Sequence, residues 1–217
     1  QYAKVLQPEI EAEMKEVDSA LSPFNKQSII TAINNNQKTS LNKKFTEVFN
    51  LAEKISRETD GAFDITVAPL VNEWGFGFKK GVDPSKHAID SLRQIVGYQK
   101  VALKDGKIVK QDPRINLDCS GVAKGYGSDC VANLLRRHGI ENFMVEIGGE
   151  VVTSGINPDR VPWRIGVTKP VDDPTLQGGE LQTVLNVTDK AMATSGNYRN
   201  FYYKGGKKYA HTIDPKT

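Results

Sequence analysis

The sequence lacks an apolar run long enough to cross a membrane as a helix. Such a helix needs about 20 consecutive, mostly apolar residues, and the 217-residue sequence contains none. Blocks of lysine and arginine are also missing, and the formal net charge is only +3. This composition argues against a nucleic-acid binder or a protein of the membrane surface. A few local contacts could still hold an anionic ligand.

Cysteine is equally scarce, since Cys119 and Cys130 are the only two. An oxidising compartment would permit a disulfide, but two cysteines do not establish one. We expect two unpaired small residues in the core. The length suffices for one large domain or two small ones, with an ordinary apolar fraction of 38%.

Apolar residues at helical spacing predict three helices. The first two cover residues 8–20 and 42–57, and the third follows a glycine-rich turn that ends at Gly127 and closes near His138. Pro8 suits the first turn of the first helix.

Hairpins are predicted at Asp105-Gly106 and Gly205-Gly206, because such dipeptides favour tight turns. Further strands are expected over residues 115–118, 143–147, 150–155, 163–168 and 183–187. Helices first and strands later predict an α+β fold, with mixed or antiparallel sheets flanked by helices.

Glycine, small hydroxyl residues and charges gather in several segments between these elements. In residues 59–66, Gly61 is expected to end the preceding helix, whereas Asp64 lies among apolar neighbours and needs a partner if it is buried. A structural hydrogen bond and a ligand contact are both open for Asp64. In residues 118–127, a strand enters a glycine-rich turn and a helix N-terminus, which together can hold phosphate beside Lys124. Neither the dinucleotide fingerprint nor the P-loop matches there.

Carboxylates and one histidine stand out further along. Glu146 and Glu150 flank Gly148-Gly149, where a tight turn with solvated carboxylates is favoured over a metal or sugar site. His211 lies three residues before Asp214 and could act as a general base, although a structural role is equally open. The hairpin at Gly205-Gly206 is expected to bring residues 193–200 and 211–217 together.

In this order, the segments resemble the FAD:protein FMN transferases, the ApbE-like family. The matching segments cover nearly the whole chain: Leu21–Phe24, Thr59–Thr66, Pro69–Asn72 with Trp74–Gly77, Leu117–Tyr126, Val145–Glu150, Ala193–Asn200 and His211–Thr217. The resemblance implies an ApbE-like, T-fold-related architecture. It also implies Mg²⁺-dependent phosphoryl transfer, in which FAD is split, AMP leaves and FMN is esterified to a threonine of a target flavoprotein. The usual acceptors are subunits of membrane redox complexes.

The family's functional positions transfer residue by residue. Its flavin-binding positions fall on Phe24, Ala62, Phe63, Asp64, Asp118, Lys124, Thr194, Ser195 and Ile213, with Gly196 beside them. Phe24 would stack against FAD, and the backbone carbonyl of Gly121 would ligate Mg²⁺. His211 falls where the family has its proposed base for the acceptor threonine.

The resemblance also implies features outside the printed sequence. The family's side-chain metal ligands, an Asp and a Thr, are expected beyond Thr217, and an early strand and a lipoprotein cysteine ahead of Gln1. Residues 1–217 are therefore expected to form a single ApbE-like FMN transferase domain that lacks its N-terminal strand and its C-terminal segment. The full-length protein is expected in the periplasm or on the outer face of the cytoplasmic membrane, held only by a lipid anchor.

Rival functions remain open. With water in place of the threonine, the same site would be an FAD pyrophosphatase that gives FMN and AMP. A non-catalytic FAD-binding protein would not need His211, so this histidine favours an enzyme. An α+β interaction domain with chance glycine turns is the remaining alternative.

Overall fold

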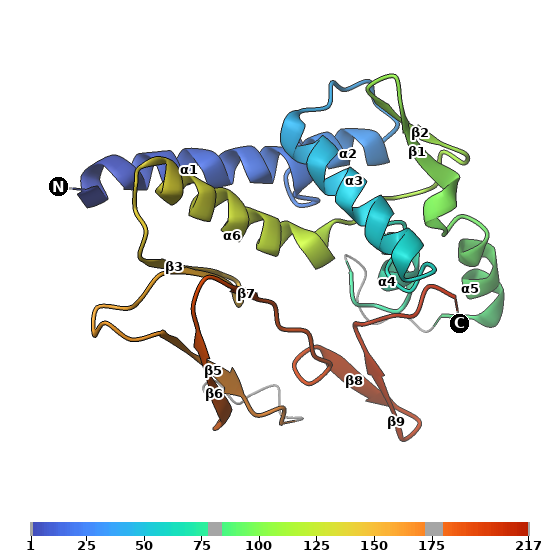
Figure 1. Ribbon diagram of the computed structural model, residues 1–217. Coiled ribbons are helices and arrows are strands. Elements are labelled where there is room, and N and C mark those ends of the chain that lie inside the picture. The colour runs from blue at the N-terminus through green and yellow to red at the C-terminus, as the bar shows by residue number, and fades with distance from the viewer. Residues whose placement is uncertain (1, 78–83, 172–179, 217) are drawn as a thin grey trace. The chain divides into compact units, whose positions relative to one another are not determined.

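A computed structural model describes residues 2–77, 84–171 and 180–216 of the chain (Figure 1). The chain forms two compact units. The helix-rich unit comprises Lys15–Ala123 and His211–Thr217, and the strand-rich unit comprises Gln1–Met14 and Lys124–Ala210. Two long helices, α1 (Tyr2–Leu21) and α6 (Ser120–Arg137), contribute residues to both units. The expectation of one domain that lacks flanking segments stays a prediction.

The helix-rich unit is built around helix α3 (Lys43–Glu58). Its other elements are α2 (Ile29–Asn34), α4 (Ala68–Glu73), α5 (Lys86–Arg93), the 3₁₀ helix η1 (Tyr98–Lys100) and the hairpin of β1 (Val101–Lys104) and β2 (Lys107–Lys110). The hairpin turns at Asp105-Gly106 as predicted, with positive φ at both residues. Helices α2, α4 and α5 were not anticipated from the sequence.

Helix α3 shows why these residues fold locally as they do. Asn42 caps its start by accepting the backbone N–H of Phe45 at 2.9 Å. Apolar side chains at helical spacing form its buried face: Phe45, Val48, Phe49 and Ala52. The Gly61 N–H donates to Ser56 O at 2.7 Å with φ of +76° at Gly61. Gly61 therefore helps to end the helix, as expected.

The strand-rich unit packs α6 and the first part of α1 on a three-stranded sheet of order β3-β4-β7. Its strands are β3 (Phe143–Ile147), β4 (Glu150–Ser154), β7 (Ala191–Met192) and the two-stranded pairs β5 (Trp163–Thr168) with β6 (Leu181–Val187) and β8 (Phe201–Lys204) with β9 (Lys207–Ala210). Every described pairing is antiparallel. The α+β prediction is therefore confirmed.

One apolar cluster holds α6 against the sheet. Its buried members are Val131, Ala132, Leu135, Phe143, Val145 and Val152. Leu6, Ile10 and Met14 of α1 pack against this cluster. Arg137 forms an ion pair with Glu13 beside it, and Nε2 of His138 lies 2.7 Å from Oε2 of Glu9. The inward face predicted for α6 is confirmed, since Cys130, Val131, Leu134 and Leu135 are buried.

Three local predictions were wrong. Pro8 lies inside α1 and not in its first turn, because the helix extends back to Tyr2. Residues 115–118 do not form a strand, although Ile115 and Leu117 are buried. The backbone of Leu117 pairs with the side-chain amide of Asn34 at 2.7 and 2.9 Å instead of a neighbouring strand. The glycine-rich stretch before Gly127 is already helical from Ser120 onward.

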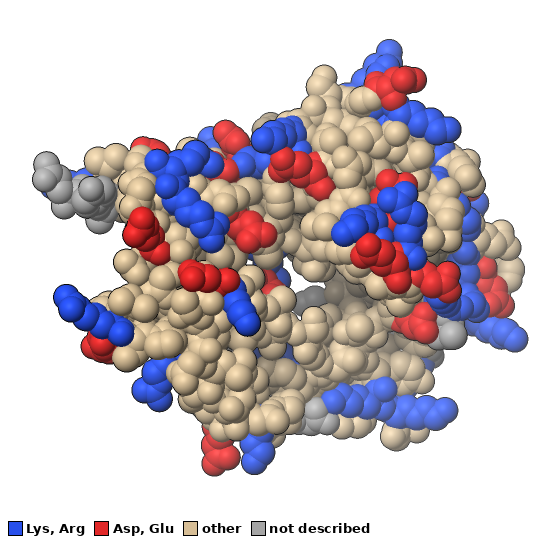
Figure 2. Space-filling view, viewed as in Figure 1, with Lys and Arg blue, Asp and Glu red and all other residues tan. Residues whose placement is uncertain are grey.

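Charges and cysteines agree with the composition. Lysine and arginine mix with aspartate and glutamate over the face shown in Figure 2, and i,i+4 ion pairs line α3, as between Lys54 and Glu58.

No helix in the described part of the chain combines the length and apolar character needed to cross a bilayer. Cys119 and Cys130 are both buried, and neither is part of a disulfide. Burial raises the pKa of the Cys119 thiol to about 12.

A half-buried lysine stabilises the end of α2. The Nζ atom of Lys110 donates to the carbonyl oxygens of Ile33 (3.0 Å), Pro113 (3.2 Å) and Ile115 (3.0 Å). These acceptors use all three protons of the ammonium group. Burial lowers the pKa of Lys110, and Asp112 partly opposes this shift.

We expect Lys110→Met to lower the free energy of unfolding by about 1–3 kcal/mol, because carbonyl groups in a partly buried site lose a charged donor. Denaturant unfolding of both proteins measures the difference. The control is Lys107→Met, since Lys107 is exposed on the same hairpin. Equal stability of the two variants would contradict this role for Lys110.

Candidate functional site

The loop after α3 is organised by the buried carboxylate of Asp64, which is 7% exposed. Its Oδ1 accepts the backbone N–H and the hydroxyl of Thr66, both at 2.7 Å. Its Oδ2 accepts the N–H of Tyr98 at 2.7 Å, while the Thr66 hydroxyl accepts the N–H of Gly97 at 2.7 Å. The structural hydrogen bond considered for Asp64 is therefore present. A flavin contact of Asp64 stays a prediction.

The same loop lies next to the start of α6. The backbone N–H of Asp118 donates to Ile65 O at 2.7 Å. A Cβ atom added at Gly121 would come within 3.2 Å of Cε2 of Phe63. The fold thus brings Phe63, Asp64, Asp118 and Gly121 together within the helix-rich unit, although Asp118 follows Asp64 by more than 50 positions in the sequence.

The amino end of α6 differs from the predicted phosphate loop. Asp118 Oδ1 accepts the N–H of Ser120 at 2.7 Å. The N–H groups of Val122 and Ala123 donate to Cys119 O at 3.0 and 2.8 Å. Three of the first four amides of α6 therefore already have acceptors. Fewer amides are available to an anion there than the sequence pattern predicts.

Lys124 is the fifth residue of α6 and belongs to the strand-rich unit. Its Nζ atom contacts Glu150 Oε1 at 3.0 Å and Gly148 O at 3.0 Å. Glu150 Oε2 accepts the backbone N–H of Thr194 at 3.3 Å. Glu150 therefore joins two predicted site residues, Lys124 and Thr194.

The remaining predicted residues lie on exposed loops. Phe24 is 78% exposed between α1 and α2, and Ala62, Ser195, Gly196 and His211 are also exposed, whereas Ile213 is half-buried. The segment of His211 and Ile213 is held on the loop after α3 by Lys216, whose Nζ contacts Asp60 Oδ2 at 2.9 Å. This contact lowers the pKa of Asp60. Residues 193–200 belong to the other unit, so their predicted proximity to residues 211–217 stays a prediction.

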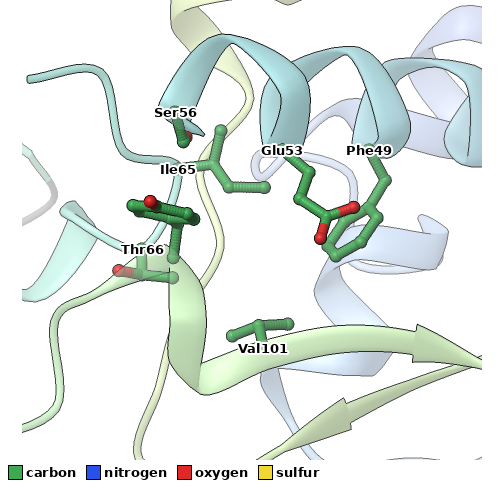
Figure 3. A pocket seen from close by; sticks show the side chains of 7 residues that line it. Phe49, Glu53, Ser56, Ile65, Thr66 and Val101 are labelled. Atoms are coloured by element: carbon green, nitrogen blue, oxygen red, sulfur yellow. The ribbon is translucent and has the colours of Figure 1, made fainter. Parts of the chain in front are cut away.

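A pocket beside Asp64 is too small to hold a flavin. Its cavity volume is about 10 Å³, room for about one water molecule and far below the roughly 300–1,000 Å³ of typical ligand sites. Figure 3 shows Phe49, Glu53 and Ser56 on α3, opposite Val101. Buried Ser56 Oγ has no hydrogen-bond partner within the described ranges.

The described residues supply an incomplete donor set for a metal. No group of three or more His, Cys, Asp or Glu side chains is placed to hold an ion in the part of the chain that the structure describes. Gly121, the predicted backbone ligand, is the second residue of α6. Mg²⁺ needs few protein ligands when it is bound to phosphates, so the predicted ligands beyond Thr217 remain essential to the metal proposal.

Sequence reasoning underestimated Glu150 and missed Thr66 and Lys216. The turn at Gly148-Gly149 is tight, with positive φ at both glycines, as predicted. Glu146 is exposed as predicted, but the Glu150 side chain is only 14% exposed and is paired with Lys124. The only signal in the sequence for a Lys124–Glu150 ion pair was their opposite charge, since each lies in a segment predicted to belong to the site. Nothing in their spacing of 26 residues predicts the pair.

The ApbE family model matches residues 1–217. The FAD:protein FMN transferase of Vibrio cholerae serotype O1 is 38% identical over 220 residues, which are 99% of this chain and 65% of the relative. The FAD:protein FMN transferase of Escherichia coli K12 is 33% identical over 221 residues, which are 98% of this chain and 62% of the relative. The chain thus spans less than two thirds of the length of these curated relatives.

Solved structures of flavin transferases are also similar to this chain. The flavin transferase ApbE from Vibrio cholerae aligns with a TM-score of 0.85 at 37% identity, over 98% of this chain and 68% of that chain. The apo flavinyl transferase ApbE from Pseudomonas stutzeri aligns with a TM-score of 0.84 at 30% identity, over 98% and 66%. These likenesses confirm an α+β protein of ApbE-like architecture. The chain belongs to the ApbE family.

We expect Asp64→Asn to lower the free energy of unfolding by about 1–3 kcal/mol, because the amide nitrogen cannot accept a hydrogen bond that the carboxylate accepts. Thermal or denaturant unfolding measures the loss. Asp105→Asn is the control, because Asp105 is exposed in a turn that asparagine tolerates. If Asp64→Asn is as stable as the parent protein, Asp64 does not organise this loop.

Proposed function

We propose that the protein containing this chain transfers the FMN moiety of FAD to a threonine hydroxyl of a target flavoprotein and releases AMP. The main support for this proposal is that the chain belongs to the ApbE family. Relatives called FAD:protein FMN transferase match 98–99% of this chain. The geometry supports it, because segments far apart in sequence converge within each unit: Phe63 on Gly121, and Lys124 with Thr194 on Glu150.

The proposed reaction is a phosphoryl transfer. The acceptor oxygen forms a bond to the phosphorus of the FMN half, and the bond between that phosphorus and the bridging oxygen breaks. AMP leaves with the bridging oxygen, and the proton of the threonine hydroxyl passes to a base. Such reactions need little covalent chemistry from the protein, mainly positioning and stabilisation of charge.

The residues of this chain have distinct parts in the proposal. Lys124 places a cation to meet the pyrophosphate. Among the described residues its ammonium group bonds to Gly148 and Glu150, which leaves one of its three protons for the ligand. Asp64 and Asp118 fix the loop that carries Phe63. His211 accepts the proton of the acceptor hydroxyl, a role that suits an imidazole near neutral pH.

Mg²⁺ is part of the proposal on the strength of the family resemblance. When bound, it would stabilise charge on the pyrophosphate oxygens. From this chain, the carbonyl of Gly121 is the proposed ligand, and the others are expected on a segment beyond Thr217.

The family resemblance also supports a proposal for the acceptor protein and for the location of the enzyme. We propose that acceptors are flavoprotein subunits of membrane redox complexes. The full-length protein would act in the periplasm or on the outer face of the cytoplasmic membrane, attached by a lipid anchor. Recovery of the protein only from the cytoplasmic fraction of its host would contradict this location.

The direct test incubates the full-length protein with FAD, Mg²⁺ and a candidate acceptor domain. We expect a fluorescent acceptor band on a denaturing gel under ultraviolet light, together with one AMP for each flavin attached. AMP and free FMN without a band, across several acceptors, would favour a pyrophosphatase. FAD retained without AMP would favour a binding protein, and neither AMP nor retained FAD would refute the proposal.

For His211→Ala we expect transfer to fall by about 100-fold or more, the usual contribution of a general base, while the affinity for FAD is unchanged. Initial rates of flavinylation and calorimetry with FAD measure the two effects. His138→Ala is the control, because His138 pairs with Glu9 on the far end of α6 from Lys124. Transfer by His211→Ala at the parental rate would exclude His211 as the base.

A further inference from the structure

The side chain of Lys124 lies against the turn between β3 and β4. A Cβ atom added at Gly148 would come within 2.9 Å of Cδ of Lys124, so the lysine stem needs a residue without a side chain at this position. Gly148 also has φ of +58°, which glycine adopts without strain. The close approach lets Nζ reach Gly148 O at 3.0 Å. The turn thus fixes the stem and one proton of the ammonium group.

Glu150 fixes the second proton. Its Oε1 lies 3.0 Å from Lys124 Nζ, with 14% of the glutamate side chain and 48% of the lysine side chain exposed. Oε2 of the same carboxylate accepts the N–H of Thr194 at 3.3 Å. A single side chain therefore sets both the direction of the lysine and the position of the loop that follows β7.

The backbones that carry this pair are also tied to each other. Ser128 is fully buried on α6, and its Oγ lies 3.2 Å from Lys124 O and 3.1 Å from Glu150 O. Gly127, the preceding residue, faces the sheet, since a Cβ atom there would lie 3.7 Å from Cδ1 of Ile147, an ordinary van der Waals contact. The Lys124–Glu150 pair thus lies on rigid elements and not on a free loop.

We propose that Glu150 is the positioning residue for Lys124 and holds the ammonium group so that its remaining proton meets the pyrophosphate of a bound dinucleotide. This inference rests on the proposed function, because it takes FAD as the ligand. Glu150 acts through Lys124 and not on the substrate. The carboxylate also restricts the lysine side chain to few rotamers before the ligand binds. Less side-chain entropy is then lost on binding, so the affinity for the ligand is higher.

A double-mutant cycle tests the coupling, with the affinity for FAD measured by calorimetry on the full-length protein. We expect Lys124→Ala and Glu150→Gln each to weaken binding by about tenfold, the scale of one charge-assisted hydrogen bond. The loss in the double variant should fall well short of the product of the two single losses, because Glu150 acts on the ligand mainly through Lys124 and otherwise only through the backbone of Thr194. The loss in Lys124→Ala should be larger at low salt.

Two further variants separate positioning from simple folding effects. Glu141→Gln removes the same charge from an exposed site in the same unit and should bind like the parent. Glu150→Asp keeps the carboxylate on a shorter stem and should bind more tightly than Glu150→Gln. If Glu150→Gln fails to fold, the cycle is run with Glu150→Asp, for which the same lack of additivity is expected.

The outcomes distinguish this inference from the proposed function. Additive losses, with a double variant about 100-fold weaker than the parent, would overturn the role of Glu150 while FAD binding by the parent still stands. Tighter binding by Glu150→Gln would show that Glu150 competes with the ligand for Lys124, which also overturns it. No binding of FAD by the parent would overturn the proposed function and this inference together.

Discussion

A carboxylate that is removed from water must find hydrogen-bond donors, since an unpaired buried charge is far too costly to keep. Asp64 meets this constraint with three donors drawn from two segments, its own loop and the backbone of Tyr98. Thr66 passes the connection on to Gly97. The loop after α3 is consequently held in one conformation, although it has no regular secondary structure.

The position of the α6 start depends on this loop. Ile65 offers its carbonyl to the N–H of Asp118 only because its neighbours Asp64 and Thr66 are fixed. Asp118 in turn accepts the N–H of Ser120, which lets the helix begin there. The approach of Phe63 to Gly121 follows from the same chain of contacts. In the helix-rich unit, the segment around Asp64 that matches the family therefore stabilises the fold, whatever its part in the chemistry.

Local signals in the sequence predicted those elements whose causes are local. Asn42 and the apolar stripe from Phe45 sufficed for α3, and Asp105-Gly106 sufficed for a hairpin. The strand predicted over residues 115–118 is absent although Ile115 and Leu117 are buried, because a sequence pattern does not reveal which group satisfies the backbone. Here the partner is the side chain of Asn34, 83 residues away from Leu117.

The same limit applies to the candidate site. Glycines between Asp118 and Gly127 predicted a turn from propensity alone, yet the stretch from Ser120 is the first part of α6, whose later residues pack in the apolar cluster. Tertiary context commonly overrides helix propensity. The family motifs located residues that converge, such as Phe63 with Gly121 and Ile65 with Asp118. They did not reveal Glu150 as the partner of Lys124, since an ion pair between a helix and a strand depends on tertiary structure.

The elements of the strand-rich unit differ in how much apolar surface they bury, and this bears on where charge can be placed accurately. Within the described residues, β5 and β6 pair only with each other, and Leu181 is 58% and Leu185 42% exposed. Two-stranded pairs are marginally stable in isolation. By contrast, α6, β3 and β4 share a buried apolar cluster. Lys124 and Glu150 both belong to this well-packed part. A transferase that works mainly by positioning charge gains most when its cation is on elements of this kind, because small displacements of a catalytic group reduce the rate steeply.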